Sequence, residues 1–337
     1  MTNWPIPTFT DVLAARLRIA PHLRSTPLFA YLALDKLVGA RVHVKHENHH
    51  PVGAFKVRGG VNLVAQLSNE ERGRGLIAAS TGNHGQSLAF AARRFGVTAR
   101  ICVPDHSNPV KVAAMKNLGA ELIIGGADFD EARENAERLA AEHGYRYVHS
   151  GNEPDLIAGV ATETLEILTQ QPDVDVVIVP VGGGSGAAGA CIVAKAVNPA
   201  IRVIAVQSDA APAAYLSWKE GRLVQSESHT YAEGLATRVP FELPQAILGA
   251  HLDDFVLVSE QEIRAAQGTM IEATCNLIEA SGAAPLAAAL RLADDLHGRR
   301  VALVASGGNV SPEQLVDVLS QTTGRPDPQA ASSSPLL

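Results

Sequence analysis

The sequence predicts an α/β fold of two lobes, each with a mostly parallel sheet flanked by helices. Short runs rich in Val and Ile alternate with helix-length segments in which apolar residues recur every three or four positions. Hydrophobic residues make up 46% of the chain and aromatic residues only 4%, which is typical of strands buried under layers of Ala, Val, Leu and Ile. The length of 337 residues suits about two domains.

The Val- and Ile-rich runs are expected to be buried strands. They cover residues 41–45, 76–79, 99–103, 121–124, 174–179, 202–206, 255–258 and 299–304. Helices are expected at residues 86–95, 110–118, 129–143 and 157–168. This alternation predicts parallel strands joined by right-handed crossovers.

Polar segments divide the chain into the two expected lobes. The turn from His149 to Pro154 is interpreted as a crossing between them. The larger lobe would then comprise residues 1–50 and 151–323, and the smaller one residues 51–150. Scattered Gly, Pro and Ser in residues 208–244 predict an irregular segment at the edge of a site. The composition of residues 324–337 predicts a disordered tail.

Charge and cysteine content narrow the classes of function. With 28 Lys and Arg against 35 Asp and Glu and no basic stripe, nucleic acid is not expected as a partner. Cys102, Cys191 and Cys275 stand singly in apolar stretches, so we expect buried thiols in a reducing compartment. Charged residues interrupt the first apolar stretch, whereas the apolar region of a signal peptide is uninterrupted. This difference favours a location in the cytoplasm.

One uncharged segment, residues 176–194, is almost long enough to cross a membrane. A run of glycines after Pro180 would break such a helix. We therefore interpret the segment as a buried strand, a glycine turn and a buried helix, and expect no membrane association.

Lys56 is the first candidate for chemistry. It lies just before a helix expected to begin near Arg58, and the positive end of a helix disfavours an ammonium group. A neutral lysine amine can form a Schiff base with an aldehyde. The alternative is a solvated lysine at a helix start.

Three turns that follow expected strands supply the other candidates. Residues 80–86 (Ser-Thr-Gly-Asn-His-Gly-Gln) carry small polar groups suited to a carboxylate, or simply cap a helix. The turn from Gly182 to Gly186 lets the backbone wrap a phosphate. The turn 306–309 offers the hydroxyl of Ser306 at a strand's carboxyl end, although it could be only a turn.

The second turn also fits another cofactor. Gly184, Gly186 and Gly189 have the dinucleotide-binding spacing, and Gln207 and Asp209 follow where an acid for the ribose is expected. This leaves a nicotinamide-dependent oxidoreductase open. An aldehyde-reactive lysine, a phosphate cradle, a carboxylate turn and a hydroxyl for a ring nitrogen together fit pyridoxal phosphate better.

The order and spacing of these motifs resemble the threonine/serine dehydratase and serine racemase group of fold-type II pyridoxal-phosphate enzymes. The resemblance rests on Ala54-Phe55-Lys56-Val57-Arg58-Gly59, on residues 80–86, on the glycine run and on Ser306-Gly307-Gly308-Asn309, and it spans roughly residues 10 to 320. It implies a two-lobed fold like that of the tryptophan synthase β subunit. The larger lobe would bind the cofactor phosphate, and the smaller one the substrate carboxylate.

The resemblance also implies roles for individual residues. Lys56 would hold the cofactor as an imine and move the α-proton, and Phe55 would back the ring. Asn83 would bind the phenolic oxygen, and Ser306 would face the ring nitrogen. The substrate carboxylate would be held by Ser80, Thr81, Gly82, Asn83 and His84, and the phosphate by Gly182, Gly183, Gly184, Ser185 and Gly186.

The activity implied is α,β-elimination from a β-hydroxy α-amino acid, by default L-threonine or L-serine, giving a 2-oxo acid and ammonia. Related racemases commonly have a serine where Thr81 stands, and that serine acts as a second catalytic base. Thr81, the second candidate catalytic residue, keeps the hydroxyl but adds a methyl group that restricts its rotation, so a racemase stays an alternative function. Relatives usually have asparagine near Gly151, so 3-hydroxyaspartate, phenylserine or a hydroxyectoine-pathway amino acid are further substrate alternatives.

The remaining expectations concern metals, regulation and assembly. Asp209 alone offers too few oxygens for a hard cation, and His43, His46, His49 and His50 lack a completing carboxylate or thiol, so no metal is expected. No regulatory domain is expected after Ser306, which favours the catabolic type. A homodimer or homotetramer is expected.

Overall fold

The computed structural model describes residues 4–107, 109–127 and 129–322, and these form two sheets. The six-stranded sheet has the order β1-β2-β10-β7-β8-β9 and is parallel except for β1, which pairs antiparallel with β2. Its strands are β1 (Leu28–Ala30), β2 (Arg41–His46), β7 (Val176–Pro180), β8 (Arg202–Ser208), β9 (Asp254–Val258) and β10 (Arg300–Ala305).

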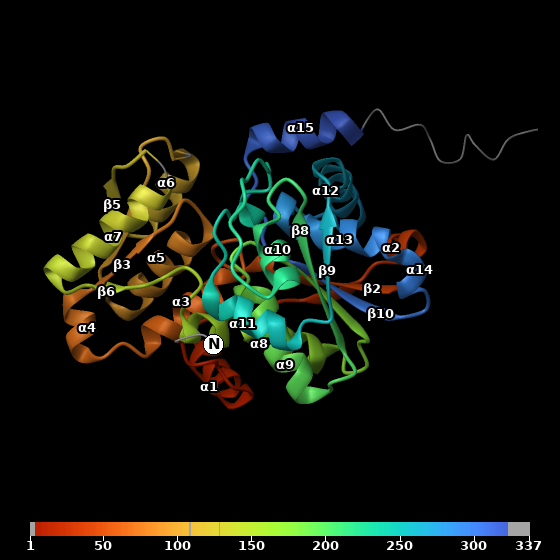
Figure 1. Cartoon of the computed structure of the whole chain (residues 1–337), viewed down its shortest axis with the longest axis horizontal. Helices are drawn as coiled ribbons and strands as arrows, with labels where there is room; N and C mark the ends of the chain where they lie inside the picture. The colour runs from red at the N-terminus through yellow and green to blue at the C-terminus, as the bar shows by residue number, and fades with distance from the viewer. Residues whose placement is uncertain (1–3, 108, 128, 323–337) are drawn as a thin grey trace, which may run out of the picture.

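The four-stranded sheet is entirely parallel and has the order β5-β4-β3-β6. Its strands are β3 (Leu76–Ala79), β4 (Ala99–Val103), β5 (Glu121–Ile124) and β6 (Arg146–Tyr147). Helices α4 (Asn69–Arg74), α5 (Asn83–Phe95), α6 (Pro109–Asn117) and α7 (Phe129–His143) lie with it on the left of Figure 1. This is the architecture expected from the alternation of apolar runs.

Two helices, α3 (Lys56–Ala65) and α1 (Phe9–Ile19), pack between this part of the chain and the larger sheet. Helix α3 packs against both α5 and α8 (Pro154–Gln170). Helix α1 places Val12 in the core of the larger sheet and Ala15 in that of the smaller one. The two sheets are therefore joined by packed helices as well as by the chain crossings.

The other helices surround the six-stranded sheet (Figure 1). They are α2 (Leu32–Val38), α9 (Ser185–Val197), α10 (Ala213–Glu220), α11 (Glu242–His251), α12 (Glu260–Thr274), α13 (Ala280–Arg291), α14 (Ala293–Leu296) and α15 (Pro312–Thr322). Short 3-10 turns cover Glu47–His49 (η1) and Glu233–Leu235 (η2).

The expected strands are confirmed, with ends that shift by one or two residues. β1 and β6 were missed because three and two residues are too few to show a hydrophobic period. The expected irregularity of residues 208–244 is partly wrong, because α10 forms within it. Residues 176–194 form β7, the glycine turn and part of α9, as interpreted.

The prediction for the cysteines needs a correction. Cys102 and Cys191 are buried, but Cys275 is exposed. It is the C-cap of α12 in the left-handed conformation, with φ of 56°, so it lies at the end of the helix and not on its apolar face. Among the described residues, no helix combines the length and the apolar character that a membrane crossing requires. The predicted tail, residues 324–337, lies outside the described part of the chain.

Candidate active site

A cavity of about 210 Å³ lies at the carboxyl ends of β3, β7 and β10. Every candidate residue from the sequence lines it, namely Phe55, Lys56, Ser80, Thr81, Gly82, Asn83, His84, Gly182, Gly183, Gly184, Ser185, Gly186 and Ser306. Helices α3, α5 and α9 begin at residues of this lining. Their free N–H groups and positive dipole ends favour an anionic ligand.

Lys56 is the first residue of α3, two positions earlier than expected, and its side chain enters the cavity. Its Nζ lies 3.1 Å from the Ser185 hydroxyl and 5.4 Å from the centre of the Phe55 ring. No carboxylate pairs with it among the described ion pairs. Burial lowers the pKa of Lys56 to about 8, which makes the neutral amine accessible near neutral pH.

Arg58, two residues further along α3, anchors this helix. Its guanidinium is fully buried and donates to Glu47 at 2.7 Å and to Glu166 at 2.8 Å. Lys45 joins the same cluster through Glu166 at 2.7 Å. The cluster fastens α3 to the end of β2 and to α8, and so fixes the position from which Lys56 extends.

The glycine turn is packed too tightly for side chains. A Cβ on Gly182 would lie 2.1 Å from the carbonyl oxygen of Gly234, and one on Gly183 would lie 2.5 Å from the Phe241 ring. Gly184 has φ of 88°, a conformation that residues with a side chain rarely adopt. Within the described chain, no hydrogen bond uses the backbone N–H groups of residues 182–186. These donors remain free for an anionic ligand.

The turn from Ser80 to His84 combines a structural and an open part. The Ser80 hydroxyl accepts hydrogen bonds from the N–H groups of Gly82 at 3.2 Å and Gly85 at 2.8 Å, so it acts as the turn's own cap. Thr81 is exposed toward the cavity. Both ring nitrogens of buried His84 lack a partner in the described structure. Burial, then Lys56 and His149, lower the pKa of His84 to about 3, so its ring is neutral.

Phe55 and Ser306 are joined through the backbone. The Phe55 N–H donates to the Ser306 carbonyl at 3.0 Å, and Ala54 forms a β-bridge with Gly307. Ser306 is buried, and the Phe55 ring is 3.2 Å from the position that a Gly186 Cβ would take. These contacts hold the start of α3 against the last strand and the glycine turn.

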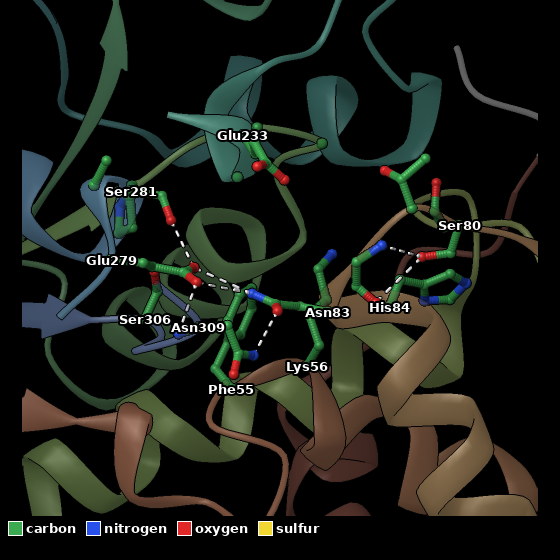
Figure 2. A pocket seen from close by; sticks show the side chains of 18 of the residues that line it. Phe55, Lys56, Ser80, Asn83, His84, Glu233, Glu279, Ser281, Ser306 and Asn309 are labelled. Carbon is green, nitrogen blue, oxygen red and sulfur yellow. Dashed lines mark hydrogen bonds between the residues drawn. The ribbon is translucent and has the colours of Figure 1, made fainter. Parts of the chain in front are cut away.

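Sequence analysis missed Glu279, which is half-buried in the lining of this cavity. Its carboxylate accepts hydrogen bonds from Asn83 Nδ2 at 3.1 Å, from the Ser281 hydroxyl at 2.7 Å and from the Asn309 backbone at 3.2 Å (Figure 2). Burial raises the pKa of Glu279. The available signal was that Glu279 is the only charged residue between Glu272 and Arg291.

An ion pair that sequence analysis also missed lines the same cavity. Lys111 of α6 forms an ion pair with Glu233 of η2, and both line the cavity. Glu233 lies in the segment that we expected to edge the site, and that placement is confirmed by the cavity lining. The pair connects an element beside the smaller sheet to one beside the larger sheet.

Comparison with known proteins identifies the family. The family described as "Pyridoxal-phosphate dependent enzyme" matches residues 19–307. The chain belongs to this family. Its cofactor is therefore pyridoxal phosphate, and the resemblance inferred from the motifs is confirmed, together with the fold class.

Individual relatives cover nearly the whole chain. It is 38% identical to an L-threonine ammonia-lyase of Thermotoga maritima, over 93% of this chain and 78% of the relative. It is 33% identical to the L-threo-3-hydroxyaspartate ammonia-lyase of Saccharomyces cerevisiae, over 94% of this chain and 97% of the relative. The structure of maize serine racemase superposes with a TM-score of 0.89 at 30% identity, over 95% of this chain and 98% of the racemase chain.

The residues present fit this cofactor. The free N–H groups of the glycine turn suit a phosphate, and the buried Lys56 amine suits an aldehyde. The dinucleotide spacing has a packing explanation instead, because a Cβ on Gly189 would lie 2.8 Å from the Ala161 backbone, where α9 crosses α8. In the described residues, no three His, Cys, Asp or Glu side chains gather as a metal site.

Proposed function

We propose that this chain is an ammonia-lyase that converts a β-hydroxy α-amino acid, by default L-threonine or L-serine, into a 2-oxo acid and ammonia. The observation that carries the proposal is the Lys56 amine, which is buried without a counter-ion beside a turn of unpaired backbone N–H groups. The ammonia-lyase names of two relatives support the reaction, and they leave the substrate side chain open between threonine and 3-hydroxyaspartate.

Each part of the cavity has a role in this proposal. Residues 182–186 bind the phosphate of pyridoxal phosphate through the backbone, Phe55 covers one face of its ring, and Ser306 and Asn83 bind its ring nitrogen and phenolic oxygen. The His84 ring and the N–H groups at the start of α5 bind the substrate carboxylate. Pyridoxal phosphate, when bound, supplies an electron sink for the substrate α-carbon.

Lys56 moves the proton. Its amine holds the cofactor between turnovers and, once released, takes the proton from the substrate α-carbon. A pKa of about 8 keeps a substantial neutral fraction of this amine near neutral pH. The β-hydroxyl leaves with the bonding electrons of its carbon–oxygen bond as water is formed. Hydrolysis then consumes one water and releases ammonia, so the net products are the 2-oxo acid and ammonia.

Lobe boundaries and assembly belong to the same proposal. Residues 1–50 with 151–323 would form the phosphate-binding lobe, and residues 51–150 the carboxylate-binding lobe, with the cavity between their sheets. The protein would work in the cytoplasm as a homodimer or homotetramer, without a required metal.

A panel of β-hydroxy α-amino acids tests the activity. L-threonine, L-serine and L-threo-3-hydroxyaspartate are each incubated with the purified protein, and 2-oxo acid and ammonia are measured. We expect equal amounts of both products from at least one of them and none from the Lys56→Met variant. Absence of both products across the panel would contradict the proposal.

Racemisation remains the second candidate, because the exposed Thr81 places a hydroxyl in the same cavity. Chiral analysis of the remaining serine distinguishes the two reactions. Elimination without D-serine is expected for this chain. We expect the Thr81→Ser variant to produce more D-serine than the native protein, because loss of the methyl group frees the hydroxyl to rotate.

A further inference from the structure

Glu279 is the most unusual group in the cavity, because its half-buried carboxylate has no cation bound to it in the described structure. It is the N-cap residue of α13, but its side chain makes no capping hydrogen bond to the helix backbone, and its carboxylate accepts from other groups. Oε1 accepts from Asn83 Nδ2 and the Ser281 hydroxyl, and Oε2 accepts from the Asn309 backbone N–H. Both oxygens accept from N–H groups, which favours the ionised carboxylate and opposes the rise in the pKa of Glu279 that burial causes.

The network also determines which way the Asn83 side chain faces. Asn309 Nδ2 lies 2.9 Å from the Val52 carbonyl oxygen, which can only accept, so this atom is a nitrogen. The same nitrogen lies 2.8 Å from Asn83 and donates to its Oδ1. The Asn83 nitrogen must then face Glu279, as Figure 2 shows.

Asn83 Nδ2 has two hydrogens, and one of them can serve both Glu279 oxygens, which lie 3.1 Å and 3.5 Å from this nitrogen. The second is available to a ligand, because Asn83 lines the cavity. Asn83 begins α5 beside the smaller sheet, whereas Glu279 and Asn309 belong to segments beside the larger sheet. The orientation of a group on one side of the cavity is therefore fixed by a carboxylate on the other side.

We propose that Glu279 is a positioning residue that, together with Asn309, holds the Asn83 amide with its nitrogen toward the phenolic oxygen of pyridoxal phosphate. The inference rests on the proposed role of Asn83 and not on the choice of substrate. Glu279 itself neither binds substrate nor moves a proton in this account. It acts by excluding the flipped orientation of Asn83, in which a carbonyl oxygen would face the cofactor oxygen.

The Glu279→Gln substitution isolates this role. Glutamine keeps the size of the side chain but replaces one accepting oxygen with an NH2 group. That group would face the Asn83 amide nitrogen or the Asn309 backbone N–H, so donor meets donor in either orientation. A flip of Asn83 relieves the first of these conflicts, and the cofactor then loses its hydrogen bond.

The test uses the holoenzyme and measures the pH midpoint at which the absorbance of the bound cofactor changes. We expect Glu279→Gln to shift this midpoint by about one pH unit, the scale of one strong hydrogen bond to a charged oxygen. In protein that also carries Asn83→Ala, Glu279→Gln should shift the pH midpoint by less than about a third of a pH unit. Equal shifts in both backgrounds would show that Glu279 acts without Asn83, and would overturn the proposal.

A second variant covers the case in which Glu279→Gln does not fold, as judged by thermal unfolding. Asn309→Ala leaves the Glu279 carboxylate in place and removes only the donor that fixes Asn83 Oδ1. It should shift the midpoint when Asn83 is present and not when Asn83 is alanine. If Asn309→Ala leaves the pH midpoint unchanged in protein that retains Asn83, the proposal is overturned.

Failure of this inference is distinguishable from failure of the proposed function. Borohydride reduction and peptide mapping of each holoenzyme show whether the cofactor is attached to Lys56. If Lys56 is labelled and Glu279 proves independent of Asn83, only the positioning role is wrong. If Lys56 is unlabelled in the native protein, the proposed function fails, and the positioning role fails with it.

Discussion

Two lysines lie only eleven positions apart, Lys45 fully buried and Lys56 half-buried in the cavity, and their surroundings give them opposite characters. Lys45 Nζ, on β2, lies 2.7 Å from Glu166, 2.8 Å from the Thr26 carbonyl oxygen and 3.2 Å from Gln170. Lys56 Nζ has a single hydroxyl neighbour, Ser185, at 3.1 Å. Burial lowers both pKa values, but at Lys45 the carboxylates of Glu47 and Glu166 oppose the effect, whereas at Lys56 nothing does.

The difference shows that partners, rather than burial, separate a structural lysine from a reactive one. An ammonium with three acceptors is held in place and kept charged, and it stabilises the fold around it. An amine without a counter-ion has little to lose by becoming neutral, and a neutral amine reacts with aldehydes. The same substitution at both positions should therefore have opposite consequences.

Lys56→Met should produce the largest effect on activity. We expect 2-oxo acid formation to fall by about 1,000-fold or more, because the variant lacks both the amine that holds the cofactor and the group that moves the α-proton. Its thermal unfolding temperature should stay the same or rise, since a desolvated amine is replaced by an apolar side chain. Retention of more than a tenth of the native rate would contradict the assignment.

Lys45→Met should mainly affect stability. It removes a cation from the buried cluster and one donor each from the Thr26 carbonyl and Glu166, which keep hydrogen bonds from Gln170 and Arg58. We expect the free energy of unfolding in urea to fall by about 3 kcal/mol. In the remaining folded protein, cofactor attachment to Lys56 should persist. A stability loss smaller than that of Lys56→Met would reverse the comparison.

The pH dependence of stability should separate the two lysines further. The folded pKa of Lys56, about 8, lies below its ordinary value of 10.5, so the unfolded chain binds more protons between these values. For the cofactor-free protein, Lys56 therefore costs most stability below pH 8, and this cost is lost as the pH rises to 10.5. Native protein and Lys56→Met, compared by urea unfolding from pH 7 to 10, should converge as the pH rises; parallel curves would contradict the low pKa.

Ser185→Ala should give the smallest effect. It removes the one hydroxyl that contacts Lys56 Nζ and also a hydroxyl from the proposed phosphate turn. One hydrogen bond is worth about 1 kcal/mol, so we expect cofactor affinity to fall about fivefold, measured by absorbance titration. Ser217→Ala is the control for loss of a buried serine hydroxyl, because Ser217 does not line the cavity. Equal affinities of the native protein and Ser185→Ala would exclude the contact.

Sequence patterns predicted the sheets and much of the cavity because these features depend on neighbouring residues. Branched apolar runs specify buried strands, and the glycine run from Gly182 to Gly186 lies wholly within one turn. The contrast between the lysines could not be predicted in this way. Glu166, which pairs with Lys45, is 121 positions away, and nothing near Lys56 in sequence shows that its amine lacks a carboxylate.

Glu279 escaped prediction for the same reason. Its contact to Asn83 spans 196 positions and joins groups beside different sheets. A single acid in an apolar segment indicates that something unusual occurs there, but only the folded chain shows which donors meet it. Helix α10 was missed for a local reason, since it is an eight-residue helix within a segment of scattered Gly, Pro and Ser.

Reductive trapping of the holoenzyme tests the central claim most directly. The native protein is treated with borohydride, digested, and mapped for the lysine that carries the reduced cofactor. We predict one labelled lysine, Lys56, with Lys45 and Lys111 unlabelled. Cofactor found on another lysine, or bound without attachment to Lys56, would contradict the claim that the unpaired buried amine is the reactive group.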